Sequence, residues 1–302
     1  MGSQSRKTLL VGDNPFHNIS HLSQDRARSR GATLTYPEYA AKLIMTSFEN
    51  GASGFMFSVS ETTLSILRVV HEKGEIQHLG LYAIVPYAYE YVKLATQVGG
   101  ILGLAKKLSK DILLSRNVSA ITMGLKGIAR TDPISLMKAY LLYEINRIRY
   151  SAGKQANLRS LVLHEMITDM ALALNLDWFF KSYVDYILNL GLTPGFNTCN
   201  FPWLVNKFKE WNLDLHNIVA VAPFNQAGFL MNPSKMDCEK ALESTPEPIL
   251  IAISILAAGY LKPSEAIDYI ANLPNINGVA VGVSKESHAR ETFKLLKEKL
   301  NR

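Results

Sequence analysis

Short apolar runs alternate with longer segments of helical periodicity along almost the whole chain. The runs are rich in Val, Ile and Leu and are apolar at successive positions, which is typical of strands covered on both faces. An eightfold alternation of such strands with helices predicts an α/β fold, a parallel (β/α)8 TIM barrel. The predicted strands are residues 9–12, 54–59, 79–85, 158–163, 193–198, 218–222, 249–254 and 278–283.

Two segments interrupt this regular cycle. Residues 87–155 are too many for one helix, and they predict an irregular helical insertion after the third strand, with a long amphipathic helix starting after Asp132 and Pro133. Residues 120–124 leave open a ninth strand. Residues 228–248 predict a short helix and a loop near the top of the barrel. Neither segment has the composition of a linker, so we expect a single barrel domain, residues 1–302.

Polar residues follow the predicted strands at their carboxyl ends. In a TIM barrel these ends meet on one face, where the loops vary and carry the active site. The most concentrated group is the segment LLVGDNPFHNISH, in which Asp13, Asn14 and His17 follow a buried strand within a few positions. His164 and Glu165 follow the apolar run of the fourth strand. We therefore expect a polar site at this end of the barrel.

Four of these residues have side chains suited to acid–base catalysis. Imidazole and carboxylate groups transfer protons near neutral pH, so Asp13, His17, His164 and Glu165 are the expected catalytic residues. The alternative for His164 is a hydrogen-bonded core imidazole. Asp13, His17 and His164 are also candidate ligands of a divalent metal, although their spacing matches no strong metal motif. The alternative is a hydrogen-bonded loop scaffold.

Amide, hydroxyl and phenol groups at other strand ends are expected to orient a substrate. Cys199 could act as a nucleophile if a cation lowered its pKa, but the alternative is a small buried residue at the rim. The residues expected to bind substrate are Asn14, Ser58, Tyr87, Asn197, Asn200 and Asn225.

The last predicted strand and its turn suggest a phosphate site. Gly282 permits a close approach of the backbone, and the amide groups at the start of the next helix could bind an anion. Ser284 and Lys285 stand at that start. The alternative is a glycine that only the turn requires.

Several stretches of the C-terminal half resemble the aldo-keto reductase family. They are LVLHE at 161–165, NTCNF at 197–201 and APFNQAGFL at 222–230, and the ending GVAVGVSKESHARETFKLL is similar to that family's final strand and phosphate-binding helix start. The resemblance spans roughly the last 140 residues, from Leu161 onward. It implies a (β/α)8 barrel, and it places His164 where the family has its active-site histidine.

The rest of the family's catalytic set is not retained. Its reductases use a Tyr acid with Asp and Lys neighbours, the Asp and Tyr after strand two and the Lys at the end of strand three. Here strand two reads GFMFSVSETT and strand three reads LGLYAIVPY, so only His164 carries over. Carbonyl reduction by that set would lack its proton donor.

Composition narrows the class of protein. The net charge of +6 is spread along the chain, which does not favour a nucleic-acid surface. The two cysteines imply no disulfide framework, and the longest apolar run, residues 249–259, is about half a membrane span. We therefore expect a soluble, cytoplasmic protein that acts on a small molecule, without a nucleic-acid or membrane partner. The sequence does not indicate its oligomeric state.

Three functional hypotheses follow. The first is an enzyme that performs acid–base chemistry, with or without a metal, on a small polar or phosphorylated metabolite, as a lyase, isomerase or hydrolase. The second is an NADPH-dependent oxidoreductase of aldo-keto reductase type with a rearranged site. The third is a noncatalytic ligand-binding barrel. A divalent metal and NADPH are the cofactors that the sequence leaves open.

Overall fold

Eight parallel strands close into a barrel in the order of the chain, β1 to β8, with β8 pairing back onto β1. The structure is a computed structural model that describes residues 6–17, 36–87, 96–100, 107 and 132–301. The strands are β1 (Thr8–Gly12), β2 (Gly54–Ser58), β3 (Gly80–Val85), β4 (Leu158–Leu163), β5 (Thr193–Asn197), β6 (Val219–Pro223), β7 (Ile249–Ile253) and β8 (Ile276–Gly282).

The predicted TIM-barrel fold is confirmed, and each of the eight predicted strands lies within two residues of the observed one. The register closes the barrel from Thr8 opposite Gly278 to Gly12 opposite Gly282. Residues 120–124, the alternative ninth strand, lie outside the described residues. The parallel arrangement places all eight carboxyl ends on one face, which is the face that carries the predicted site.

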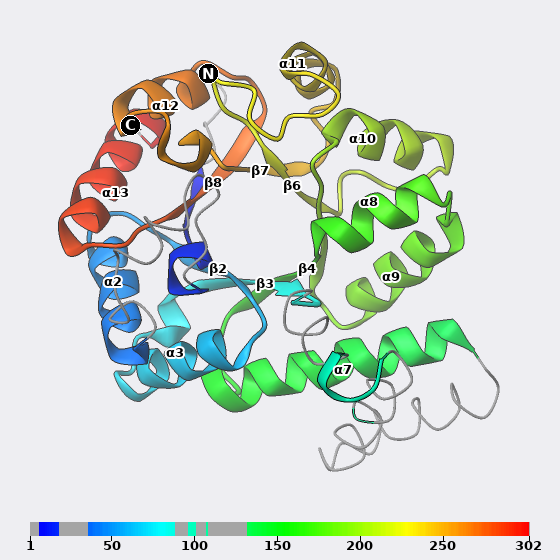
Figure 1. Cartoon of the computed structure of the whole chain (residues 1–302), viewed down its shortest axis with the longest axis horizontal. Helices are drawn as coiled ribbons and strands as arrows, with labels where there is room; N and C mark the ends of the chain where they lie inside the picture. Colours follow the sequence, from blue (N-terminus) through cyan, green and yellow to red (C-terminus); the bar gives the residue numbers. More distant parts are fainter. Residues whose placement is uncertain (1–5, 18–35, 88–95, 101–106, 108–131, 302) are drawn as a thin grey trace.

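The helices surround the strands as a ring, as seen down the short axis of the molecule (Figure 1). The helices are α2 (Pro37–Glu49), α3 (Glu61–Glu72), α7 (Pro133–Ala152), α8 (Glu165–Ala173), α9 (Asp177–Asn189), α10 (Phe201–Glu210), α11 (Lys235–Ser244), α12 (Pro263–Ala271) and α13 (Glu286–Leu300), with short 3-10 turns η1 (Asn14–His17), η3 (Ile76–His78) and η4 (Ala257–Gly259).

The strands bury both of their faces, which explains their continuous apolar runs. The outward faces pack against the helices in one large core, exemplified by Phe55, Phe57 and Phe196, all fully buried. The inward faces form a second, smaller core inside the barrel. Its buried members are Leu10, Met56, Ile84, Val162, Val219, Val221, Ile251 and Ala280. Among the described residues, these side chains fill the barrel interior below the carboxyl-end face.

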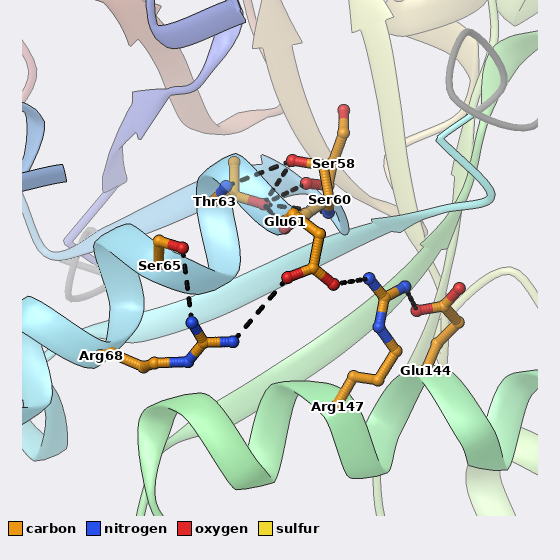
Figure 2. A network of polar contacts seen from close by, with 8 residues as sticks. All are labelled: Ser58, Ser60, Glu61, Thr63, Ser65, Arg68, Glu144 and Arg147. Atoms are coloured by element: carbon orange, nitrogen blue, oxygen red, sulfur yellow. Dashed lines mark hydrogen bonds and ion pairs between the residues drawn. The ribbon is translucent and has the colours of Figure 1, made fainter. Parts of the chain in front are cut away.

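Polar contacts fix the start of α3. The Ser60 hydroxyl accepts a hydrogen bond from Thr63 N, and Thr63 Oγ1 accepts one from Ser60 N, a capping box that starts α3. Figure 2 shows how this region continues to α7, where Arg147 lies between Glu61 of α3 and Glu144 of its own helix. Both contacts span 2.8 Å. The contact with Glu61 joins the start of α3 to the described part of the insertion.

The two irregular segments also contain the helices expected of them. Helix α7 begins directly after Asp132, whose carboxylate accepts hydrogen bonds from Ile134 N and Ser135 N. The segment 228–248 contains the short helix α11, with Ser234 at its N-cap. None of the helices in the described ranges is long and apolar enough to span a membrane.

Candidate functional site

A cavity of about 820 Å³ opens at the carboxyl ends of the strands. This volume falls within the range of small-molecule sites. Residues from the ends of all eight strands or the loops after them line it. Nine of the residues predicted for the site are among them: Asp13, Asn14, Ser58, Tyr87, His164, Glu165, Asn197, Gly282 and Ser284. The other four, His17, Asn200, Asn225 and Lys285, are not among its lining residues.

Asp13 follows β1 directly and ties the first two strands together. Its Oδ2 accepts a hydrogen bond from Ser58 N at 2.6 Å and lies 3.1 Å from His17 Nε2. The residue is 5% exposed, so these contacts replace most of its hydration. One carboxylate oxygen is therefore committed to holding the loop, as the scaffold alternative expected, while the residue still borders the cavity.

His17 contacts two residues that line the cavity without lining it itself. Its side chain is 5% exposed, and its ring stacks on Tyr87 with centroids 4.7 Å apart and planes inclined by 27°. Tyr87 follows β3 and lines the cavity. The imidazole therefore positions the Asp13 carboxylate on one side and the Tyr87 ring on the other, and it does not itself border the space where a substrate would lie.

His164 is the N-cap of α8, and this role fixes its tautomer. Its Nδ1 accepts a hydrogen bond from Met166 N at 3.2 Å, so Nδ1 carries no proton and the neutral ring carries it on Nε2. Burial lowers the pKa of His164, and the negative charges of Glu165 and Asp13 oppose this effect without cancelling it. At neutral pH the cavity is therefore lined by a neutral imidazole that donates through Nε2.

Glu165 is the first residue of α8 and lines the cavity beside His164. Its Oε2 accepts a hydrogen bond from Asn197 Nδ2 at 3.4 Å and lies 3.9 Å from Cys199 Sγ. Asn197 ends β5 and is 7% exposed. His164 and Glu165 both reach the cavity although they are adjacent in sequence, because the chain passes from strand to helix between them.

Asp169 is a polar residue of this region that the sequence analysis missed. It lies one helical turn after Glu165 and accepts hydrogen bonds from Thr198 Oγ1 at 2.5 Å and from Cys199 N at 3.1 Å. Burial raises the pKa of Asp169, and Glu165 adds to the increase, whereas the two hydrogen bonds oppose it. The i, i+4 spacing of two carboxylates on the helix after His164 was the available signal.

Cys199 has the environment of a half-buried rim residue and not of a nucleophile. Burial, followed by the charges of Glu165 and Asp169, raises the pKa of its thiol to about 12. A thiolate is therefore scarce at neutral pH. The nucleophile alternative has no support from the residues around it.

Two asparagines expected to bind substrate hold backbone instead. Asn225 is fully buried and makes two hydrogen bonds of 2.8 Å with the backbone of Phe229, one through each end of its amide. Asn200 caps α10 by accepting a hydrogen bond from Trp203 N. Both side chains form hydrogen bonds with backbone groups in a loop or at a helix start, where regular strand or helix hydrogen bonds are missing.

Only two of the three residues predicted to bind phosphate line the cavity. Gly282 and Ser284 line the cavity, whereas Lys285 is exposed and lies outside its lining. A Cβ atom at Gly282 would lie 2.7 Å from Pro15 Cδ, so close packing against the η1 turn requires this glycine. The cavity is also lined by residues that the sequence analysis did not single out, among them Lys262, Ser264, His288 and Glu291.

The candidate metal ligands do not form a metal site. Within the described ranges, no group of three or more His, Cys, Asp or Glu side chains is arranged to hold a metal ion. His17 Nε2 is engaged with Asp13, and His164 Nδ1 is engaged with Met166 N. The metal-assisted form of the first hypothesis therefore has no ligand set among these residues.

Comparison with known proteins supports the fold. No protein-family model matches the chain, and no curated protein matches its sequence. A solved structure of a candidate aldo-keto reductase from Pseudomonas aeruginosa matches with a TM-score of 0.58 and 10% identity, over 99% of this chain and 92% of that chain. A second from the same organism gives a TM-score of 0.56 and 11% identity over the same shares.

A third structure, a candidate sugar phosphate isomerase/epimerase from Anabaena variabilis, matches with a TM-score of 0.44, 10% identity and 98% and 97% coverage. Its agreement is too low to carry an argument. The first two show that the chain shares an aldo-keto reductase-like barrel fold, as the resemblance implied. Identities this low say nothing of its reaction.

Proposed function

We propose that the cavity is the active site of an enzyme that removes a proton from carbon beside a carbonyl group of a small polar metabolite. One observation carries this proposal: a neutral imidazole that donates through Nε2 shares the cavity with carboxylates. The donor suits a carbonyl oxygen that gains negative charge, and a carboxylate suits the proton that leaves. Isomerases and lyases use this pair of steps.

His164 is the electrophilic partner in this mechanism. Its Nε2–H donates to the carbonyl oxygen and stabilises the charge that forms there when the neighbouring carbon loses its proton. A neutral imidazole donor needs no proton transfer from solvent, and the half-buried site strengthens its hydrogen bond. Removing one such donor reduces kcat by about 10²- to 10³-fold in other enzymes.

Glu165 is the base. Asp13 Oδ2 accepts a 2.6 Å hydrogen bond from Ser58 N and contacts His17, whereas the contacts to Glu165 are longer, 3.4 and 3.9 Å. Glu165 takes the carbon-bound proton, and the electron pair of that C–H bond moves towards the oxygen held by His164. In an α-hydroxy carbonyl compound, return of the proton to the former carbonyl carbon, with transfer of the hydroxyl proton to the oxygen held by His164, gives the isomeric carbonyl compound. Where a leaving group stands on the β carbon, it departs with the electron pair of its bond, and an α,β-unsaturated carbonyl compound is formed.

Exchange of solvent deuterium into carbonyl compounds tests this proposal. Purified protein is incubated in D₂O with a panel of small aldehydes, ketones and hydroxyketones, each with and without a phosphate group, and exchange is followed by NMR. We expect exchange beside the carbonyl of at least one compound. The phosphorylated and free members of each pair then show whether the Ser284 side of the cavity contributes to binding.

Two variants assign the roles. His164→Asn keeps an N-cap acceptor for Met166 N but loses the Nε2 donor, and Glu165→Gln keeps an acceptor for Asn197 but loses the base. We expect each to slow exchange by about 10²-fold or more. His78→Asn, an exposed histidine before β3, is the matched control. Exchange that survives in both site variants would disprove the mechanism.

A nicotinamide-dependent oxidoreductase is the second candidate. Its support is the shared fold and the extent of the cavity, which continues from His164 to Lys262, Ser284 and His288. These polar groups fit a phosphorylated cofactor, which would supply a hydride. Tyr87 is the phenol that lines the cavity, but it follows β3, and the residues after β2 include no Asp or Tyr up to the start of α3.

Cofactor binding separates the two candidates. Thermal unfolding is measured with and without saturating NADPH, because a ligand that binds only the folded state raises the unfolding temperature. A shift that disappears in the Ser284→Trp variant would support the oxidoreductase. Unchanged unfolding at saturating NADPH would exclude it and leave the exchange reaction as the conclusion.

A further inference from the structure

The turn between β5 and α10 is held against α8 by two carboxylates of that helix. Glu165 contacts the Asn197 amide and the Cys199 thiol, and Asp169, one turn later, accepts from Thr198 Oγ1 and Cys199 N. Two like charges at i and i+4 disfavour a helix on their own. Both carboxylates contact the same turn, which explains why two acidic residues stand at this spacing on α8.

We propose that Asp169 is a positioning residue, which fixes the β5–α10 turn so that the Asn197 amide holds the Glu165 carboxylate in one orientation. This inference rests on the proposed function, in which Glu165 is the base. Asp169 does not line the cavity, so it acts through the turn and not on the substrate.

The chemistry of the Asn197 amide shows what the turn achieves. A carboxylate only accepts hydrogen bonds, so the nitrogen of the amide must face Glu165 Oε2, and its Oδ1 points elsewhere. That Oδ1 is buried and has no hydrogen-bond partner among the described residues. An unpaired buried acceptor costs stability, so the amide would rotate or withdraw if the turn did not hold it.

Thr198 transmits the constraint from Asp169. It is fully buried, its hydroxyl donates to Asp169 Oδ1, and its oxygen accepts from Asn200 N at 2.9 Å. Without Asp169, the Thr198 hydroxyl and Cys199 N both lose their acceptor inside the protein. The backbone that carries Asn197 is then free to shift away from Glu165.

Cys199 reports on this turn without any substrate. The Cys238→Ala variant leaves it as the single cysteine of the chain. In that background, Asp169→Asn and Asp169→Leu both remove the negative charge beside the thiol. Only the Asn variant keeps an acceptor for Cys199 N and a group that bonds the Thr198 oxygen. A difference between the two therefore measures the hydrogen bonds and not the charge.

We expect iodoacetamide to alkylate Cys199 about tenfold faster in Asp169→Leu than in Asp169→Asn, because two lost hydrogen bonds expose the turn. The NMR signal of the Asn197 side-chain amide should move in the Leu variant and stay near its original position in the Asn variant. Asp185→Asn, an exposed carboxylate on α9, is the control and should change neither signal. Equal alkylation in the Asn and Leu variants, with an unmoved Asn197 signal, would overturn the proposal.

If Asp169→Leu does not fold, Thr198→Val removes one of the two contacts and keeps the charge. We expect it to speed alkylation and to shift the Asn197 signal, and an unchanged turn would again overturn the proposal. In the exchange assay, Asp169→Leu should lower kcat and leave KM nearly unchanged, and Asp169→Asn should restore most of kcat.

The experiments distinguish the two proposals. A loosened turn together with full exchange in Glu165→Gln would mean that Glu165 is not the base. Lost exchange in Glu165→Gln together with an unchanged turn in Asp169→Leu would mean that Asp169 does not position it.

Discussion

His164 combines a structural role with the chemical role that we propose for it. Its Nδ1 satisfies an amide at the start of α8, and this bond leaves the proton on Nε2, which the cavity can use. Asp13 is similar, because it holds Ser58 N and His17 while it borders the cavity. At this scale the folding of the loops and the proposed chemistry depend on the same side chains.

The burial of His164 predicts a pH dependence of stability. Its pKa in the folded protein lies below the ordinary value of 6.5. As the pH falls below 6.5, the unfolded chain takes up a proton at this position before the folded chain does, so folding becomes less favourable. We expect wild type to lose more unfolding free energy than His164→Asn over this window, measured by urea denaturation.

The comparison is informative because Asn keeps the helix cap and does not titrate. His78→Asn should follow the wild-type profile, since the ring it removes is exposed. Parallel profiles for wild type and His164→Asn would show that the imidazole is solvated and not buried.

A substitution at Gly282 tests whether close packing against Pro15 requires a glycine there. A methyl group there would meet the rigid ring of Pro15 at 2.7 Å, so Gly282→Ala should destabilise the protein by about 1 to 3 kcal/mol. Gly12 is its partner in the register of β1 and β8, and a Cβ there would find its nearest neighbour at 3.4 Å. Chemical denaturation should therefore show a smaller loss for Gly12→Ala. Equal losses would mean that Pro15 moves aside.

At the scale of elements, an ion-pair network joins α3 and α7 (Figure 2). Arg147 contacts both Glu61, whose side chain is 68% exposed, and Glu144, whose side chain is fully buried. A buried carboxylate needs its hydrogen bonds, whereas an exposed one is hydrated when its partner is removed. The contact with Glu61 joins the two helices, whereas the contact with Glu144 lies within α7 and satisfies a buried carboxylate.

Substitution of Arg147 and of Glu61 should lower the free energy of unfolding by different amounts. Arg147→Met should lower the free energy of unfolding by about 2 to 3 kcal/mol, because it takes a charge-assisted hydrogen bond from Glu144. Glu61→Gln should cost less than about 1 kcal/mol. Denaturation of both variants in urea checks the order, and a larger loss in Glu61→Gln would contradict it.

At the scale of the whole molecule, closure of the barrel depends on the contact between every pair of neighbouring strands. Gly54 and Gly80 face each other in the register of β2 and β3, but they are not equivalent. A Cβ at Gly54 would lie 2.1 Å from the Gly80 carbonyl oxygen, whereas a Cβ at Gly80 would meet nothing closer than 3.5 Å. Only the first position requires glycine.

Substitution of these two glycines by alanine should therefore change the stability of the protein to very different extents. We expect Gly54→Ala to cost more than about 3 kcal/mol or to prevent folding, because the strands must separate to admit the methyl group. Gly80→Ala should fold with nearly the stability of wild type. Circular dichroism and thermal unfolding of the pair test this, and a stable Gly54→Ala protein would show that β2 and β3 adjust their spacing.

The sequence by itself determined the barrel. Continuous apolar strands and helical periodicity are local signals, because both depend on what each residue must bury, and they located the eight strands within two residues. It also predicted the face on which the cavity opens, because parallel strands place their carboxyl ends together. His164 and Asp13 were recognisable for this reason.

Only the tertiary structure decided which polar groups meet. Asn225 and Asn200 look like Asn197 in the sequence, yet their hydrogen bonds hold backbone, while Asn197 reaches Glu165 from another strand. Asp169 lies on a helix and accepts a hydrogen bond from Cys199 N, 30 residues further along the chain. Hydrogen bonds between distant segments depend on distances that closure of the barrel sets, and local patterns do not encode those distances.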